Sequence, residues 1–139
     1  MKAELLFHVL PSKTFHYKMV MQMKENKLVT MSMDLSVKII HFCGTIKGHY
    51  ALTNQLERAG TSIGANIHEA NYAHSRADFI SKLQIALKES YETEYWLKIF
   101  ILSGLSDDET ANPLRDLCGK IRHTLIASIN TAKHAAGVQ

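Results

Sequence analysis

The sequence contains few of the residues that mark several common protein classes. It has 2 cysteines, 2 prolines and 7 glycines in 139 residues, and 8% of its residues are aromatic. So few prolines and glycines leave little room for the many tight turns of an all-β chain. No apolar run approaches the roughly 18 residues of a membrane-spanning helix, and residues 1–30 lack the apolar centre of a signal peptide. We therefore expect a cytoplasmic chain with no membrane partner.

The two cysteines, Cys43 and Cys118, lie far apart in the sequence and match no metal-binding spacing. Cysteine is often buried, and thiols stay reduced in the cytoplasm. We therefore expect both residues to be free, buried thiols.

Signatures of catalysis and metal binding are also missing. No two of the 8 histidines are three or four residues apart, so no helical face carries a histidine pair. No glutamate is followed by a histidine three residues later, which a di-iron site in a helical bundle would require. There is no nucleophile elbow and no glycine-rich loop after a strand. We expect no enzyme activity, no metal, no cofactor and no small-molecule substrate.

Positive charge is concentrated at the N-terminus. Residues 1–27 contain five lysines and two glutamates, which account for the whole net charge of +3. The remaining residues carry eleven basic and eleven acidic side chains. A body without net charge argues against a strong, sequence-independent grip on nucleic-acid phosphates.

The strongest pattern in the chain is a helical hairpin between Leu52 and Leu102. Apolar residues recur at spacings of three and four in two segments, which is typical of helices that bury one face. The expected turn, Asn71 to His74, is followed by a capping box in which Ser75 and Asp78 can satisfy the first free amides of the second helix. The two stripes consist of Leu52, Leu56, Ala59, Ile63, Asn66 and Ala70, then Phe79, Leu83, Ala86, Leu97 and Ile101, the second thickened by Ile80, Leu87, Tyr91 and Trp96.

One further helix is expected on each side of the hairpin. The first begins at a Ser32 or Asp34 cap and is ended by Gly48, because glycine accepts the left-handed conformation. The last begins at the capping box that starts at Ser106, and Pro113 should either kink it or mark a fresh start. Four amphipathic helices with short connections predict an all-α, up-down-up-down four-helix bundle.

We assign the bundle to residues 31–136. Residues 1–30 form a segment outside this domain, either preceding the true start of translation or serving as a mobile basic arm. Residues 137–139 should fray.

Several polar or small residues fall on the expected buried faces. Gly60 and Gly64 cost helix stability, so something should approach them closely, either another helix of the bundle or another subunit. Asn66 continues the apolar pattern and should fix helix register. We expect a structural motif of hydrogen-bonded side chains here, formed by Arg58, Ser62, Asn66, Glu69 and Glu94.

Six cations on the last two helices could form a nucleic-acid-binding surface. These are Lys82, Lys88, Lys98, Arg115, Lys120 and Arg122. Asp78, Glu89, Glu92 and Asp116 interleave with them in the sequence, so a mixed, solvated face is the simpler interpretation.

Two segments, LTNQLERAGTSIGANIHEA and SRADFISKLQIALKESYETEYWL, resemble a bacterial family of four-helix-bundle proteins encoded in intervening sequences of large-subunit ribosomal RNA genes. The resemblance covers about Asp34 to Ala135. It implies a ring-shaped homo-oligomer, a pentamer, and kinship with the accessory protein of diversity-generating retroelements, which binds nucleic acid and a reverse transcriptase. It implies a structural role for the matching positions and no catalytic residue. The matching positions are Gln55, Leu56, Arg58, Ala59, Ser62, Ile63, Asn66, Ile67, Glu69, Ala70, Ser75, Phe79, Ala86, Glu89 and Glu94.

Together these features favour a non-catalytic, oligomeric binding module whose partner is RNA or a nucleoprotein. The alternative is a scaffold protein that binds other proteins and no nucleic acid.

Overall fold

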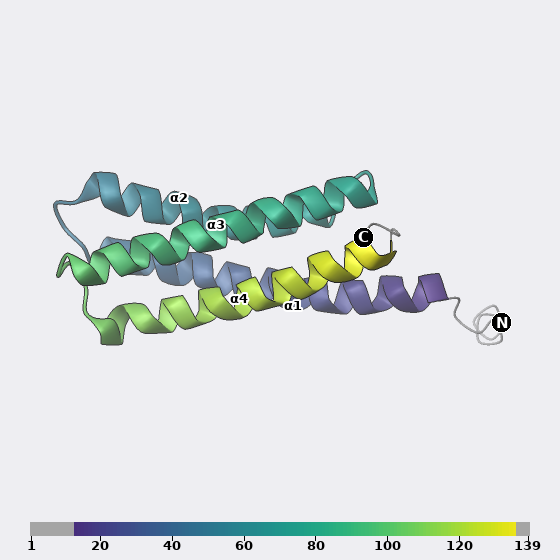
Figure 1. Cartoon of the computed structure of the whole chain (residues 1–139). Coiled ribbons are helices and arrows are strands. Elements are labelled where there is room, and N and C mark those ends of the chain that lie inside the picture. The colour runs from purple at the N-terminus through teal and green to yellow at the C-terminus, as the bar shows by residue number, and fades with distance from the viewer. Residues whose placement is uncertain (1–12, 136–139) are drawn as a thin grey trace, which may run out of the picture.

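Four helices follow one another along the chain in the computed structural model, which describes residues 13–135 and their side chains from residue 27 onward. They are α1 (Lys13–Gly44), α2 (Tyr50–Ala70), α3 (Arg76–Leu102) and α4 (Asp108–Ala135). Each helix packs against the helices before and after it, and α4 closes the arrangement against α1 (Figure 1). The predicted all-α, up-down-up-down bundle is confirmed.

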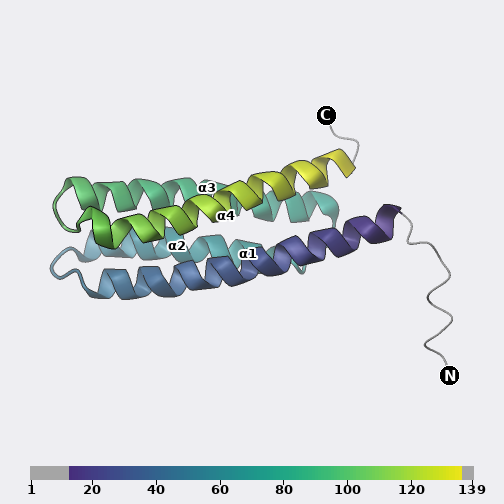
Figure 2. The same ribbon diagram turned by 90° about the horizontal axis from the view of Figure 1, so that it is seen from below.

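The ends of the bundle differ in what they carry. The α1–α2 and α3–α4 connections lie at one end (Figure 2). The α2–α3 turn, the first turns of α1 and the last turns of α4 lie at the other end. Within residues 13–135, no helix combines the length and hydropathy that crossing a bilayer requires.

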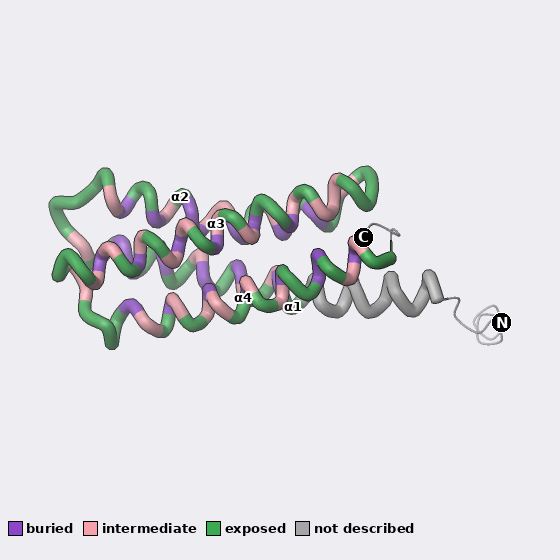
Figure 3. The backbone as a smooth tube through the Cα atoms, in the orientation of Figure 1, coloured by how far each residue is buried: buried purple, intermediate pink, exposed green. Residues whose placement is uncertain are grey.

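The core runs along the inner side of all four helices, as the distribution of buried residues in Figure 3 shows. Leu35, Leu56, Leu97 and Leu125, one from each helix, are fully buried. Burying a side chain of this size contributes about 1.5–3 kcal/mol. The ring of Phe100 meets that of Phe42 edge to face, with centroids 5.7 Å apart.

The hairpin was predicted closely. Helix α2 begins at Tyr50 and ends at Ala70, and Ser75 caps α3 by accepting a hydrogen bond of 3.1 Å from the Asp78 amide. The Asp78 carboxylate in turn accepts a bond of 3.1 Å from the backbone amide of His74. Gly104, with φ of +73°, follows the end of α3 as expected.

The predicted start of the first helix is wrong. Helix α1 begins at Lys13, and Ser32 is a buried residue inside it rather than a cap. Leu28 is 1% exposed, so the bundle extends to the N-terminal side of residue 31. The polar Ser32 interrupts the apolar stripe between Leu28 and Leu35 and hides its continuation. Residues 1–12 and 136–139 lie outside the described part of the chain, so the expectations about the arm, the true start and the frayed end stay predictions there.

Two helix boundaries also differ from the expectation. Helix α1 ends at Gly44, and Gly48, with φ of +83°, lies in the following loop. Helix α4 is capped by Asp107, whose carboxylate accepts a bond of 2.7 Å from the Thr110 amide, and not by Ser106. Pro113 lies inside α4, which continues through it without a fresh start.

The small residues of α2 bring it close to α1 of the same chain. A Cβ atom added to Gly60 would lie 2.3 Å from Cδ1 of Ile39, and one added to Gly64 would lie 3.4 Å from the hydroxyls of Ser32 and Ser36. Of the two alternatives raised by the sequence, the structure therefore supports close approach inside the bundle.

Both thiols are free and buried, as predicted. Burial raises the pKa of Cys43 to about 12, with a contribution from Glu57. Burial also raises the pKa of Cys118 to about 11, although Arg122 acts in the opposite direction. The Cys118 thiol donates a hydrogen bond of 3.2 Å to the carbonyl oxygen of Ser90.

Candidate nucleic-acid interface

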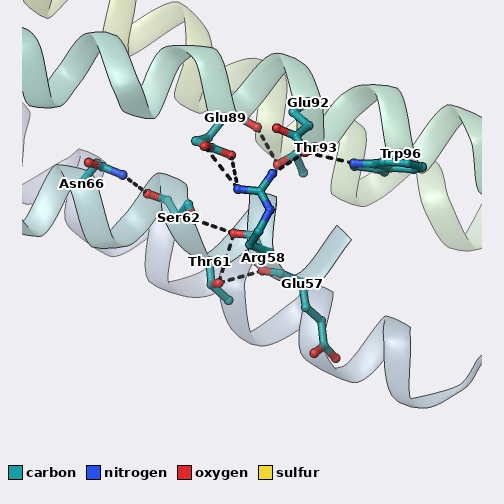
Figure 4. A network of polar contacts seen from close by, with 9 residues as sticks. All are labelled: Glu57, Arg58, Thr61, Ser62, Asn66, Glu89, Glu92, Thr93 and Trp96. Carbon is teal, nitrogen blue, oxygen red and sulfur yellow. Dashed lines mark hydrogen bonds and ion pairs between the residues drawn. The ribbon is translucent and has the colours of Figure 1, made fainter. Parts of the chain in front are cut away.

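Helix α3 directs its carboxylates to two different sides. Glu89 and Glu92 lie on the side that packs against α2, where the guanidinium of Arg58 contacts both (Figure 4). Trp96 donates a further hydrogen bond of 3.2 Å to Glu92. The hydrogen bond from Arg58 lowers the pKa of Glu92 and outweighs the opposing effect of burial, with help from Trp96. These two carboxylates are therefore engaged by α2 and do not interleave with the cations that face α4.

Ser62 and Asn66 bond within α2. The Ser62 hydroxyl donates to the carbonyl oxygen of Arg58 at 2.6 Å, and the Asn66 side-chain amide donates to the carbonyl oxygen of Ser62 at 2.8 Å (Figure 4). Asn66 is half-buried, because the buried face of α2 runs through Gly60, Ile63 and Ile67. The prediction that Asn66 lies on the seam is wrong.

The expected single network is also wrong. Glu69 is exposed and pairs with Lys82 across the α2–α3 contact at 2.6 Å. Glu94 lies on the opposite side of α3, beside α4, where its carboxylate contacts different cations. The five residues therefore belong to three separate groups: Arg58 with Ser62 and Asn66, Glu69 with Lys82, and Glu94 with α4.

Glu94 is the centre of a cluster that joins α3 to α4. Its carboxylate oxygens lie 2.5 Å from Arg122, 3.4 Å from Lys98 and 3.9 Å from Arg115. Burial opposes ionisation of Glu94, but the hydrogen bond and charge of Arg122, together with Lys98, outweigh it and lower its pKa. One carboxylate thus faces three cations, which leaves the cluster positive.

Two nitrogen atoms of this cluster lack a partner. The Nε atoms of Arg115 and Arg122 are buried, and neither has a hydrogen-bond partner among the described residues. The head group of Arg115 also donates to Asn112 at 2.9 Å, which holds it against α4. The two guanidiniums are therefore held in place while part of their donor capacity is unused.

Two exposed tyrosines lie next to the cluster. Tyr91 and Tyr95 are 51% and 55% exposed, and the guanidinium of Arg122 lies 4.6 Å from the ring centroid of Tyr91. Lys88, Tyr91, Tyr95 and Lys98 follow spacings of three, four and three, which place them along one side of α3. The prediction that Tyr91 thickens the buried stripe is wrong, since half of this residue is exposed.

An open groove of about 1110 Å³ runs along the outer side of α4. Glu94, Arg115 and Arg122 line it from the α3 side, and Lys27 and Met31 line it from α1. Gly119 is among the residues that line it, and a Cβ added there would have no atom within 4 Å beyond its chain neighbours and the backbone of its own helix. Helix α1 therefore adds the cation Lys27, and α3 adds the carboxylate of Glu94, to a depression centred on α4 that Asp116 also lines.

The structure brings together three of the six predicted cations. Lys98, Arg115 and Arg122 surround Glu94 where α3 meets α4, and Lys88 lies on the exposed side of α3, one turn from Glu92 and in one row with Tyr91 and Tyr95. We call these residues together the α3–α4 face. Lys120 lines the groove beyond this face, and Lys82 lies on the α2 side with Glu69. The sequence placed Tyr91 on the buried stripe and Lys27 in the N-terminal segment, and Tyr95 was not singled out, although lysines and tyrosines at helical spacing indicate a shared side of α3.

No metal site competes with this interpretation in the described part of the chain. Among residues 13–135, no group of three or more histidine, cysteine, aspartate or glutamate side chains could hold a metal ion.

The chain is similar to a solved structure from Bacteroides thetaiotaomicron VPI-5482, a protein with unknown function from the S23 ribosomal protein family. The two share 39% sequence identity over 77% of this chain and 98% of the other, with a TM-score of 0.73. No curated protein matches the chain. The family model of the 23S rRNA-intervening sequence protein matches residues 24–127, well over half of the chain. The chain therefore belongs to the 23S rRNA-intervening sequence protein family.

Proposed function

We propose that this protein is a non-catalytic, oligomeric four-helix-bundle module that binds RNA, free or within a nucleoprotein, through its α3–α4 face. The observation that carries this proposal is the separation of charges on α3. Arg58 engages Glu89 and Glu92 on one side, while Lys98 lies with Arg115 and Arg122 around Glu94 on the other side. A body without net charge can therefore present a positive face.

The charge of this face suits a phosphate backbone better than an isolated anion. Three cations of two adjacent helices surround Glu94, and Lys88 lies farther along α3, one turn from Glu92. An extended polyanion can contact spaced cations in turn, and each contact releases counterions from the nucleic acid. The family's name, which refers to an intervening sequence of 23S rRNA, makes RNA the first nucleic acid to test.

Salt-dependent RNA binding tests the proposal. Fluorescence anisotropy with a labelled RNA should show affinity falling as salt rises, because each phosphate contact contributes about 0.7–0.9 to the slope of log affinity against log salt. The double variant Lys88→Gln/Lys98→Gln should bind more weakly at every salt concentration, with a slope shallower by about one per lysine.

The matched control is Lys38→Gln/Lys47→Gln, which removes the same charge from exposed positions of α1 and the following loop. It should bind RNA nearly as the parent does. Equal loss in both double variants would mean that net charge alone drives binding. Loss of binding on removal of residues 1–23, with both double variants unaffected, would place the contact on the N-terminal segment.

A second candidate, a protein-binding scaffold, is favoured by a different surface. Met33, Val37 and Ile40 follow one another at spacings of four and three on the outside of α1 and are 63%, 51% and 49% exposed. Exposed apolar stripes of this kind mark interaction sites, and we propose that another copy of the chain covers this one in a homo-oligomer, a pentamer.

Val37→Glu should lower the solution mass without loss of helix content. An unchanged solution mass would contradict self-association through this stripe and would indicate that a different protein binds there.

A further inference from the structure

We infer that the α3–α4 face binds RNA in its single-stranded form, with bases stacked on Tyr95 and Tyr91 and phosphates on Lys98, Arg115 and Arg122. This inference rests on the proposed function and adds to it the class of RNA. It follows from the placement of aromatic rings among the cations, which phosphate binding alone does not require.

The exposure of the two tyrosines is the first step. Both rings lie on the same side of α3 and are more than half exposed, although rings of this size are usually largely covered. The edge of Tyr95 meets Trp96, with centroids 5.1 Å apart and planes at 73°. Contact with Trp96 restrains the Tyr95 ring while more than half of the residue stays open to solvent. A restrained, open ring suits stacking against a base, because it loses little freedom on binding.

The arrangement around Tyr91 is the second step. The Arg122 guanidinium lies against this ring at 4.6 Å, and the Glu94 carboxylate holds the same guanidinium at 2.5 Å. Arg122 is therefore oriented by α3 on two sides, and its buried Nε has no partner among the residues described. The buried Nε is out of reach of a ligand, but a guanidinium held in this way keeps its positive charge next to the exposed Tyr91 ring, where the phosphate of a stacked nucleotide would lie.

Spacing is the third step. Along α3 the two rings of Tyr91 and Tyr95 are flanked by Lys88 and Lys98, over about 15 Å at 1.5 Å per residue. This order suits two adjacent bases of a single strand with phosphates on either side of them. Proteins that bind single strands combine a positive groove with aromatic rings on which bases stack.

Duplex RNA fits this face less well. Its bases are paired and stacked on one another, so they are unable to stack on tyrosine side chains, and its deep major groove excludes most side chains. A duplex would use the cations and leave both rings without a partner. The rings therefore favour the single strand.

The experiment compares tyrosine variants on two forms of one RNA. Anisotropy at fixed salt would measure a labelled oligonucleotide alone and annealed to its complement, with the parent, Tyr95→Ala and Tyr95→Trp. Tyr95→Ala should weaken single-strand binding about 5- to 150-fold, the range that corresponds to loss of one stacked base, and change duplex binding little. Tyr95→Trp should keep the affinity, and the salt slope should be the same in all three.

The control is Tyr50→Ala, which removes a ring that is 74% exposed at the start of α2. It should bind like the parent. Equal affinity of Tyr95→Ala and the parent for the single strand, with the lysine variants still weakened, would overturn this inference and leave the proposed function standing. Absence of any salt-dependent RNA binding would overturn both. A changed solution mass of Tyr95→Ala would show instead that the ring lies in a contact between subunits.

Discussion

Gly60 and Gly64 lie one turn apart on α2 and face the same helix, α1, at different distances. An alanine at either position adds up to about 1 kcal/mol of helix propensity. At Gly60 the new methyl group would overlap the buried Ile39 side chain, and such overpacking costs about 1–3 kcal/mol. At Gly64 it would make ordinary contacts with two serines. Urea unfolding should therefore show Gly60→Ala to be less stable than the parent and Gly64→Ala to be equally or more stable.

A second substitution shows whether Ile39 is the cause. Ile39→Val removes the Cδ1 atom that Gly60→Ala would meet, and on its own it should cost about 0.5–1.5 kcal/mol. In the Gly60→Ala background it should cost much less or restore stability, with a coupling of at least about 0.5 kcal/mol. Simple addition of the two costs would show that Ile39 moves aside freely.

At the scale of single residues, the sequence indicated which positions are small but not what they touch. The glycine pair suggested close approach, which is correct, and left the approaching surface open. Asn66 continued the apolar spacing but lies beside the seam, because the buried face of α2 follows Leu56, Gly60, Ile63 and Ile67. Periodicity defines a face to within about one residue, and a glycine can carry the seam without adding to the apolar pattern.

Between elements, Glu94 is the side chain that links α3 to α4 by charge. Its lowered pKa means that the folded protein favours the carboxylate. The resulting stability is fully present above the ordinary pKa of 4.5 and is lost as pH falls through the lower pKa of the folded state. Glu94→Gln should therefore be less stable than the parent near neutral pH, and the difference should shrink below about pH 4.5.

The comparison requires urea midpoints for both proteins across this pH range. Glu69→Gln is the matched control, because Glu69 also pairs with a cation but is largely exposed and outside the cluster. Exposed ion pairs contribute little, so this variant should follow the parent at every pH. A constant difference between Glu94→Gln and the parent across the whole range would mean that the amide disturbs packing instead.

At this scale the sequence predicted where the hairpin helices begin and end better than it predicted which neighbouring helix each of their faces contacts. Caps and apolar stripes are local, and they gave the hairpin nearly residue by residue. The flanks of α3 depend on which helix packs on each side, a consequence of bundle order that no local pattern contains. Glu89 and Glu92 therefore alternate with Lys88 and Lys98 in sequence, while Arg58 of α2 holds them on the flank away from Lys98 and Glu94.

For the whole molecule, zero net charge along residues 28–139 was a misleading guide to its surface. Ion pairs distribute the charges unevenly: the α2–α3 side gathers Glu69, Glu89 and Glu92, and the α3–α4 face keeps an excess of cations. Long-range attraction of a polyanion depends on this local excess. A body without net charge can thus present one face with an excess of cations, which is the property that the proposed function requires.

The N-terminal limit of the folded unit gives the last prediction, tested by a truncation series. The family match begins at residue 24, and Leu28 is 1% exposed in the core. Removal of residues 1–23 should leave helix content per residue and melting temperature near those of the full chain. Removal of residues 1–30 takes away Leu28 and should cost about 2–5 kcal/mol, the range for emptying a buried leucine site.

Leu28→Ala in the full chain separates the lost side chain from the lost helix. If it accounts for most of the cost of removing residues 1–30, a single core contact defines the limit of the bundle. A much larger cost for the truncation would show that the preceding turns of α1 stabilise the bundle beyond Leu28. Destabilisation on removal of residues 1–23 alone would contradict the prediction, because the folded unit would then begin before the segment shared with the family.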